Sequence, residues 1–223
     1  MTAERIRIGI VGAGANTRAR HIPGLRALDR VELVSVCNRS EESSQAAARE
    51  AGIRRIYSNW QELVEADDTN AIVIGTWPYL HGPITQKALE ARMAMDAAEA
   101  HRMFEAARLR PRLVTQIVPA PFTLPFDNTI RTLIDEGFVG DVLSLEVRAV
   151  GGTFINPEPA MGWRQDRALS GFNTMSLGIW YESVLRWIGE ATAVTAKGRT
   201  FVKQRRDADG ALRSATIPDH IDV

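Results

Sequence analysis

The residues IRIGIVGAGANT, Ile6–Thr17, decide the fold of this 223-residue chain. Their first half is an apolar run typical of a buried strand, and a glycine turn and the expected start of a helix near Thr17 follow at once. Gly12 allows a tight turn, and Gly14 lets a pyrophosphate approach the backbone at the N-terminus of that helix. The stretch predicts a dinucleotide-binding turn, with an ordinary tight turn as the alternative, because Thr17 stands where the fingerprint has a third glycine or an alanine.

The chain beyond this turn alternates short apolar segments with helical ones. The second expected strand, Val31–Cys37, ends about 20 residues after the glycine turn, as a dinucleotide-binding unit requires. Ala71–Thr76 is a short, continuous and β-branched run, which is typical of a buried parallel strand. Between these two strands we expect a helix over Glu41–Ala51 that stops at Gly52, a strand at Arg55–Tyr57, and a helix that runs from a Ser58 cap to Glu65. This alternation predicts an α/β fold with a doubly wound parallel sheet, whose ligands bind at the carboxyl ends of the strands.

The composition is that of a soluble enzyme. Hydrophobic residues make up 45% of the chain, which is enough for one sizeable core or two modest ones. Lys plus Arg and Asp plus Glu number 27 each, so no surface for nucleic acid or for an anionic membrane is indicated, and small molecules or other subunits are the expected partners. Only a few charged residues precede the first strand, and no apolar run approaches the length of a membrane span. A cytoplasmic location is therefore expected.

Three further classes of site are not indicated by the sequence. Cys37 is the only cysteine, and its place at the end of an apolar strand predicts a core residue rather than a nucleophile. His101 has no metal-ligand partner at a suitable spacing, so no metal site is expected. The G-x-S-x-G and P-loop patterns of hydrolases and kinases are also missing from the chain.

The loop after the second expected strand indicates which dinucleotide is bound. An NAD-preferring site presents an Asp or Glu to the ribose hydroxyls, whereas this chain has Asn38, Arg39 and Ser40 there. Arg39 can meet a 2′-phosphate with its guanidinium and Ser40 can add a hydroxyl, so NADP is favoured and NAD is the alternative. Ser40 can at the same time cap the helix that follows.

All the expected cofactor contacts follow the carboxyl ends of strands. The first two loops supply Gly12, Gly14, Ala15, Asn16 and Thr17, and then Asn38, Arg39 and Ser40. The loop after the strand that begins at Ala71 adds Gly75, Thr76, Trp77, Tyr79 and His81.

Three segments carry a family resemblance. Gly12–Gly14 and the following Arg20–Leu25 match a glycine turn and a helix with a His-x-Pro-x-Leu end, and Ile74–His81 matches a proline-containing loop that leads to a histidine. Leu133–Val142 matches a helix, a glycine and a strand that open a second domain. With these segments the chain resembles, over most of its length, the glucose-fructose oxidoreductase, inositol dehydrogenase and MocA family of NAD(P)-dependent dehydrogenases.

The resemblance implies two domains. Residues 1–118 would form a Rossmann NAD(P)-binding domain, and residues 119–223 part of an α+β domain whose open, mainly antiparallel sheet holds the substrate and often mediates homo-oligomers. Pro119, Pro121 and Pro125 support a boundary near Pro119 on local grounds. Later in the chain we expect a helix over Asp127–Glu136 closed by Gly137, strands at Val142–Val150 and at Ala191–Val202 with an interruption at Gly198, a charged hairpin turn at Arg205–Gly210 and a strand entry within Ile217–Val223.

Residues 83–110 depart from the family pattern. There the family has a strand that ends in Glu-Lys-Pro and supplies a catalytic lysine, whereas this chain shows no such strand and a break around residues 91–92 is expected. Asp96-x-x-Glu99 resembles a capping box and predicts a new helix at that point. Loss of a central strand would expose the edges of its neighbours, so a segment absent from this sequence is favoured over a native deletion. We expect the second domain to be incomplete as well.

A second departure concerns the proton shuttle. Gly171–Glu182 resembles the family's glycine-rich helix start, where an Asp and, one helical turn later, a His move the substrate proton. This chain has Ser176 and Trp180, neither of which acts as a base near neutral pH. The catalytic candidates are Tyr181, with a packed aromatic residue as the alternative role, and His81, with a loop-positioning histidine as the alternative. Lys87, on a helix face exposed to solvent, does not replace the missing lysine.

The substrate site is expected in the second domain. Trp163 and Arg164 resemble a family segment that lines the substrate pocket, and Arg164 would hold a carboxylate or a sugar oxygen, or else form a surface pair with Asp166. The residues expected to contact substrate are Trp163, Arg164, Asn173, Trp180 and Tyr181.

Together these features give two functional hypotheses. The first is an NADP-dependent oxidoreductase that moves a hydride between the nicotinamide and a hydroxyl or carbonyl carbon of a sugar-like or polyol-like substrate. The alternative is a catalytically silent NADP-binding protein of the same fold, with a regulatory or assembly role, which Ser176, Trp180 and the missing lysine motivate.

Overall fold

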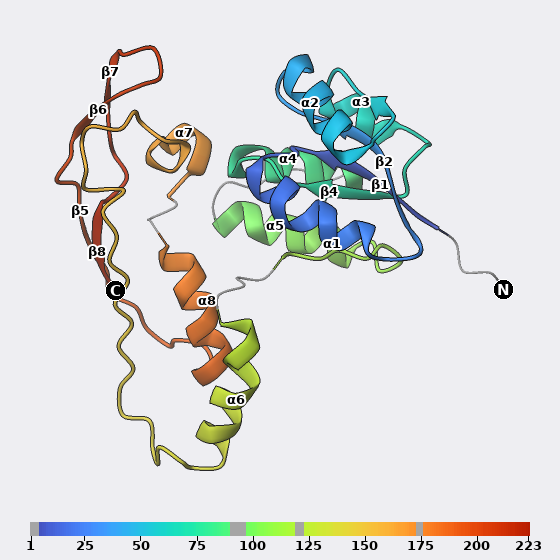
Figure 1. The fold of residues 1–223 in the computed structure, drawn as a ribbon. Coiled ribbons are helices and arrows are strands. Elements are labelled where there is room, and N and C mark those ends of the chain that lie inside the picture. Colours follow the sequence, from blue (N-terminus) through green and yellow to red (C-terminus); the bar gives the residue numbers. More distant parts are fainter. Residues whose placement is uncertain (1–4, 90–96, 119–122, 173–175) are drawn as a thin grey trace. The chain divides into compact units, whose positions relative to one another are not determined.

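The computed structural model describes residues 5–89, 97–118, 123–172 and 176–223. The chain forms two compact units, Met1–Val114 and Thr115–Val223 (Figure 1). The expected boundary residues Pro119 and Pro121 lie outside the described residues.

A parallel sheet forms the centre of the first unit. Its strands are β1 (Ile6–Val11), β2 (Val31–Cys37), β3 (Arg55–Ile56) and β4 (Ala71–Ile74), in the order β3-β2-β1-β4. The four strands predicted in this part of the sequence are confirmed, with β3 and β4 shorter than expected. The strand order reverses between β1 and β4, and in such sheets ligands bind in the crevice beyond the carboxyl ends at that point.

Helices connect the strands of this sheet. After β1 the chain is helical over residues 15–26, with a π-helical stretch, η1 (Thr17–His21), followed by α1 (Ile22–Arg26), so the helix begins slightly before the expected Thr17. α2 (Glu41–Ala51) begins after Ser40, whose hydroxyl accepts the Ser43 N–H as predicted, and ends at Gly52 with φ of 56°.

The cap of α3 (Trp60–Glu65) differs from the expectation. Asn59, rather than Ser58, is the N-cap residue, and its side-chain oxygen accepts the backbone N–H of Glu62 at 2.9 Å. Ser58 instead donates its hydroxyl to the Glu62 carboxylate at 2.8 Å. Both residue types can cap a helix, and the extended backbone of Asn59 is what places its side chain over the first turn.

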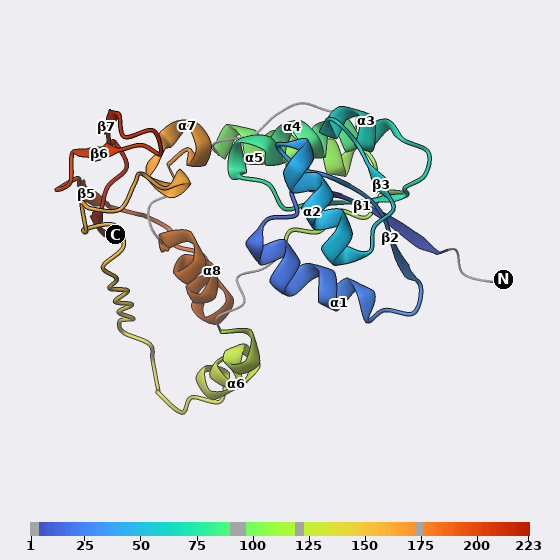
Figure 2. The same cartoon turned by 45° about the horizontal axis from the view of Figure 1, so that its top comes forward.

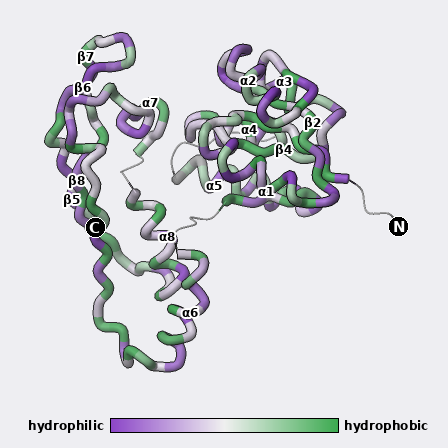
Figure 3. Tube along the Cα trace, in the orientation of Figure 1, coloured by the Kyte–Doolittle hydropathy of each residue, from purple (hydrophilic) through white to green (hydrophobic). Residues whose placement is uncertain are grey.

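Helices cover both faces of the sheet, which confirms the doubly wound arrangement. One face of β1 and β2 packs against α1 and α2 through Ile8, Ile10, Ile22, Val36, Ala47, Ala48 and Ala51. The other face packs against α3 and against α4 (Pro78–Leu89) through Val11, Cys37, Leu63 and Ile84. Gly9 lies between these layers in β1, and a Cβ there would be 2.7 Å from Leu63, so the close approach of α3 favours glycine at this position. The hydropathy colouring of Figure 3 shows hydrophobic residues along β2 and β4 of this sheet.

Two helices follow β4. α4 spans Pro78–Leu89 and α5 spans Ala97–Arg108, and within the described part of 83–110 no residue forms a strand. The start of α5 agrees with the helix predicted from Asp96-x-x-Glu99, whereas Asp96 itself and the expected break at 91–92 lie outside the described residues. Lys87 is exposed as expected and forms an ion pair with Glu65.

The second unit combines helices with two antiparallel ribbons. α6 (Leu124–Asp135) and α8 (Leu177–Ile188) pack against each other (Figures 1 and 2). In the sequence, η2 (Trp163–Gln165) and α7 (Arg167–Ser170) come between these two helices. β5 (Lys197–Arg199) pairs with β8 (His220–Asp222), and β6 (Gln204–Arg206) pairs with β7 (Leu212–Ser214).

Two strand predictions in this unit are wrong. Val142–Val150 has the alternating pattern of a strand, yet no backbone ladder forms there and Leu143 is 93% exposed. Of Ala191–Val202 only β5 is a strand, and Gly198 lies inside it opposite Ile221 instead of interrupting it. A strand requires a partner for its backbone groups as well as a suitable pattern. For these two segments the described residues supply one partner strand, β8, which pairs with β5.

The predicted hairpin is present between β6 and β7, with Gly210 at φ of 82°. Its charges do not all face solvent, however. Arg205 is only 3% exposed, and its guanidinium donates to the backbone carbonyls of Phe154 and Asn156. A buried arginine whose donors are taken up by carbonyls is a structural residue, because its charge must be compensated inside the unit.

Candidate functional site

The glycine turn after β1 is bonded to both neighbouring strands. The Gly12 N–H donates to the Cys37 carbonyl at the end of β2, and the Gly75 N–H donates to the Val11 carbonyl at the end of β1, both at 2.8 Å. The N–H of Ala13 donates to the side-chain oxygen of Asn38 at 2.7 Å. These bonds bring the three loops that the sequence singled out to one end of the sheet.

Thr17 and Gly75 interlock where the turn meets β4. Thr17 is buried, and its hydroxyl donates to the Gly12 carbonyl at 3.2 Å. A Cβ on Gly75 would lie 2.2 Å from the Thr17 Oγ1 and 2.5 Å from the Gly12 oxygen, and a Cβ on Gly12 would lie 2.6 Å from the Thr76 nitrogen. The missing third glycine of the fingerprint is therefore compensated by Gly75, whose lack of a side chain leaves room for Thr17.

The rim of the turn is open. Gly14, Ala15 and Asn16 are exposed, and the nearest atom to a Cβ on Gly14 would be the Gly75 oxygen at 4.0 Å. The first backbone N–H groups of a helix point away from it without partners inside it, and they favour negative charge. Residues 14–16 thus present a surface of the kind that binds a pyrophosphate, and their contact with the cofactor stays a prediction.

Asn38 links the glycine turn to the start of α2 through hydrogen bonds. Besides accepting from Ala13, its side-chain amide donates to the Ser43 carbonyl at 3.0 Å, and its backbone N–H donates to the Ser44 hydroxyl at 2.8 Å. Its carboxamide therefore holds the turn against the start of α2. The sequence indicated a cofactor contact at this position, and this anchoring role was not anticipated.

Arg39 and Trp77 meet across the end of β1. Arg39 is exposed after β2, and the centre of its guanidinium lies 5.3 Å from the centroid of the Trp77 ring, which follows β4. This distance is within the range of a cation–π contact. The sequence placed both residues in the cofactor site and did not predict their contact.

His81 holds the loop that contains Trp77. Its Nε2 lies 2.7 Å from the Thr76 carbonyl oxygen and donates a hydrogen bond to it. The bond fixes the chain between β4 and α4, so the loop-positioning role has a direct structural basis. The catalytic role of His81 stays a prediction, and Tyr79 is half-buried in the first turn of α4.

Cys37 is a core residue, as predicted. It is 3% exposed among the apolar side chains beneath α3 and α4. Burial, together with the negative charge of Glu62, raises the pKa of its thiol to about 11. At neutral pH the thiol is therefore protonated and a poor nucleophile.

In the second unit Trp163 and Arg164 pair with each other. The Arg164 guanidinium lies 4.2 Å from the centre of the Trp163 ring, and Asp166 accepts the Ala168 N–H as the cap of α7. Arg164 is exposed, so its donors can meet a ligand. Asn173 lies outside the described residues, and the substrate roles of all these residues remain predictions.

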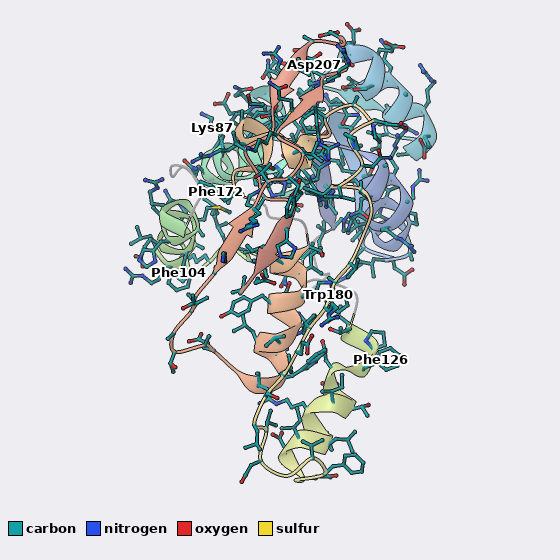
Figure 4. The ribbon with its side chains drawn as sticks, turned by 90° about the vertical axis from the view of Figure 1, so that its left-hand side faces the viewer. Lys87, Phe104, Phe126, Phe172, Trp180 and Asp207 are labelled. Atoms are coloured by element: carbon teal, nitrogen blue, oxygen red, sulfur yellow. The ribbon has the colours of Figure 1, made fainter. Side chains whose placement is uncertain are left out.

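α8 carries Trp180 and Tyr181, and a polar cluster fixes this helix against α6. Figure 4 shows Trp180 on α8, and Tyr181 is 44% exposed. Arg186 of α8 donates to the Asp127 carboxylate at 2.7 Å, and the Trp187 indole N–H donates to the other oxygen of the same carboxylate, also at 2.7 Å. Thr123 and Ser183 complete the cluster through a hydroxyl bond of 3.0 Å. The sequence signal for this cluster was Arg186, a charged residue within the largely apolar sequence of α8. Sequence analysis did not identify the cluster.

This cluster sets the protonation of Asp127. Burial alone would raise the pKa of its carboxyl, but the hydrogen bonds from Trp187, Thr123 and Arg186 and the charge of Arg186 outweigh it and lower the pKa. Because the folded-state pKa is lowered, the carboxylate stabilises the fold at pH values above its ordinary pKa of 3.8. That stabilisation is lost as the pH falls through the pKa of the folded state.

Asp127→Asn should lower the midpoint of thermal unfolding of the second unit at pH 7 by about 5 °C, because Arg186 loses one of its charged partners while its ion pair with Glu182 remains. Near-UV circular dichroism of the α8 tryptophans would follow the transition. The difference from the wild type should shrink as the pH falls below about 4, where the carboxyl of the unfolded chain takes up a proton, and should vanish once the pH is below the lowered pKa of the folded carboxyl. Asp135→Asn, on the exposed part of the same helix, is the matched control. Equal effects of the two substitutions would contradict the assigned role of the cluster.

Comparison with known proteins decides the family. A family model described as "Oxidoreductase family, NAD-binding Rossmann fold" matches residues 6–116, and one described as "GFO/IDH/MocA C-terminal domain" matches residues 128–221. The chain belongs to the Gfo/Idh/MocA oxidoreductase family. Its first unit is accordingly the NAD(P)-binding Rossmann domain of that family, which confirms the resemblance inferred from the sequence.

Individual Gfo/Idh/MocA relatives cover most of the chain. The glucose-fructose oxidoreductase domain-containing protein 2 of Xenopus laevis is 27% identical over 95% of the chain and 56% of its own length. The dTDP-3,4-didehydro-2,6-dideoxy-alpha-D-glucose 3-reductase of Streptomyces violaceoruber is 28% identical over 80% of the chain and 53% of its own length. A levoglucosan dehydrogenase structure, in complex with NADH and L-sorbose, shares the fold with a TM-score of 0.73 at 18% identity, over 98% of this chain and 62% of that one.

The chain thus spans a little over half the length of these curated relatives. Among the described residues no helix has the length and hydropathy of a membrane span, and no three acidic, histidine or cysteine side chains gather as metal ligands.

Proposed function

We propose that this protein binds NADP(H) and transfers a hydride between the nicotinamide and a hydroxyl or carbonyl carbon of a sugar-like or polyol-like substrate. The observation that carries the proposal is the interlocked turn of Gly12, Thr17 and Gly75, which leaves residues 14–16 exposed for a pyrophosphate, in a member of an oxidoreductase family. The substrate class is supported by the names of two similar proteins, a dTDP-3,4-didehydro-2,6-dideoxy-alpha-D-glucose 3-reductase and a levoglucosan dehydrogenase.

Each loop has a distinct role in holding the cofactor. The open turn after β1 would bind the pyrophosphate, Arg39 would bind the 2′-phosphate, and the loop held by His81 would line the nicotinamide side. The bound cofactor supplies the hydride acceptor or donor. NADP is favoured over NAD because Asn38 and Arg39 stand where a carboxylate would contact the ribose hydroxyls.

The second part of the chain would supply the substrate contacts. We assign the cofactor domain to residues 1–118 and the substrate domain, which would also mediate homo-oligomers, to residues 119–223. Trp163, Arg164, Asn173 and Trp180 would hold the substrate through stacking and hydrogen bonds to its oxygens. In the reductive direction the Tyr181 hydroxyl would give a proton to the carbonyl oxygen while a hydride adds to its carbon.

Binding and turnover have to be measured separately. NADPH titrated by calorimetry should bind to the full chain, and a panel of sugars, polyols and aldehydes should then change the absorbance of the reduced cofactor. Tyr181→Phe should lower kcat and leave the Kd of NADPH unchanged. NADPH binding without turnover on any substrate of the panel would favour the catalytically silent alternative, for which Ser176 and Trp180 in place of an acid and a base are the specific observation. Absence of binding would overturn both.

A further inference from the structure

Trp77 is half-buried between β4 and α4, and its indole ring meets Arg39 at 5.3 Å. Arg39 follows β2, and β2 and β4 flank β1 on its two sides. The contact therefore bridges the carboxyl end of β1, directly where the glycine turn begins. His81 holds the Trp77 loop through the Thr76 carbonyl, so the indole side of the contact is anchored.

Arg39 remains exposed while it makes this contact, so its N–H donors are accessible to a ligand. A guanidinium over an aromatic ring uses one of its faces, whereas its N–H donors lie in its plane and remain at its edge. These donors are the groups that bind phosphate oxygens in pairs. An exposed arginine also loses rotamer freedom when a ligand orders it, and a ring that already restrains it lowers that cost.

We propose that Trp77 is a positioning residue for the 2′-phosphate, because its indole holds Arg39 at the adenosine end of the crevice before the nucleotide binds. The inference rests on the proposed function, since it requires Arg39 to bind that phosphate. The ligand class is an adenosine nucleotide that carries a phosphate on the ribose 2′-oxygen. Without the indole, Arg39 keeps its charge but is no longer held in place. The preference for the 2′-phosphorylated nucleotide should therefore be reduced and not abolished.

Trp77→Leu tests the proposal with two fragments of the cofactor. Calorimetry on the full chain would give the Kd values of 2′,5′-ADP and 5′-AMP, which differ only in the 2′-phosphate. The variant should raise the Kd of 2′,5′-ADP by about 3- to 5-fold, the size of an exposed cation–π contact, and that of 5′-AMP by less than about 2-fold. In an Arg39→Ala background the same substitution should change neither value. Trp77→Phe should restore part of the lost affinity.

Trp60→Leu is the matched control, since Trp60 is another half-buried indole of the same unit that packs against the core beneath α3 and α4. It should affect the two ligands equally. If Trp77→Leu changes both Kd values by the same factor, or neither, while the wild type prefers 2′,5′-ADP, the role of Trp77 is refuted and the proposed function stands. If the wild type does not prefer 2′,5′-ADP, NADP selectivity itself fails, and the role of Trp77 with it.

Discussion

Gly75→Ala should abolish detectable NADPH binding and lower the thermal midpoint of the first unit by about 5–10 °C. The added methyl group would lie 2.2 Å from the Thr17 hydroxyl and 2.5 Å from the Gly12 carbonyl. Neither atom can move freely, because Thr17 is buried in the helix and Gly12 is bonded to β2. The turn must therefore open, and its phosphate-binding N–H groups lose their alignment. We expect a rise in Kd of about 100-fold or more, measured by calorimetry.

Two variants separate this steric effect from a general effect of replacing glycine. Gly24→Ala, in α1, meets no atom within 4 Å and should leave binding and stability unchanged or slightly improved, because alanine favours the helix. Thr17→Ala combined with Gly75→Ala removes the closest contact and should restore part of the binding. Full NADPH affinity in the Gly75→Ala single variant would show that the interlocked turn does not form the cofactor site.

Arg39→Ala should raise the Kd of NADPH by about 10- to 100-fold and that of NADH by less than about 3-fold. Only the phosphorylated cofactor presents a 2′-phosphate, and hydrogen bonds to a charged group contribute more than neutral ones. The measurement is a pair of titrations with the two reduced cofactors under identical salt, because exposed charges are screened. The preference for NADPH over NADH should largely disappear.

Arg49→Ala is the charge-matched control for this experiment, since Arg49 is an exposed arginine in the last turn of α2. It removes the same charge and should change both Kd values by less than about 2-fold. Equal losses for NADPH and NADH in Arg39→Ala would contradict phosphate recognition by Arg39.

Much of the first unit could be predicted from local sequence. The apolar runs of β1, β2 and β4, the Ser40 cap and the Gly52 stop all follow from backbone and side-chain chemistry within a few residues. These local signals were enough to predict a doubly wound parallel sheet and the loops that form its ligand-binding edge. The family models then confirmed the resemblance that the glycine turn and the His81 loop had indicated.

Local sequence failed where a contact partner decides the structure. Val142–Val150 alternates like a strand but pairs with no described segment, and Arg205 looks like part of a solvated turn yet is buried against two carbonyls. The cluster around Asp127 joins helices about 60 residues apart in sequence. Neither the hydrophobic pattern nor the charge of a segment predicts which distant groups will pair with its backbone or its charged side chains.

In the first unit, local sequence was enough to give the order of strands and helices and the position of the glycine turn, and it predicts that Arg39 binds a phosphorylated ribose. Three contacts became visible only in the folded chain: Gly75 makes room for Thr17, Asn38 holds the turn, and Trp77 meets Arg39. The physical reason is that the ends of β1, β2 and β4 become neighbours only when the parallel ladder forms. Packing distances between such loops depend on that ladder, and no periodicity along the chain encodes them.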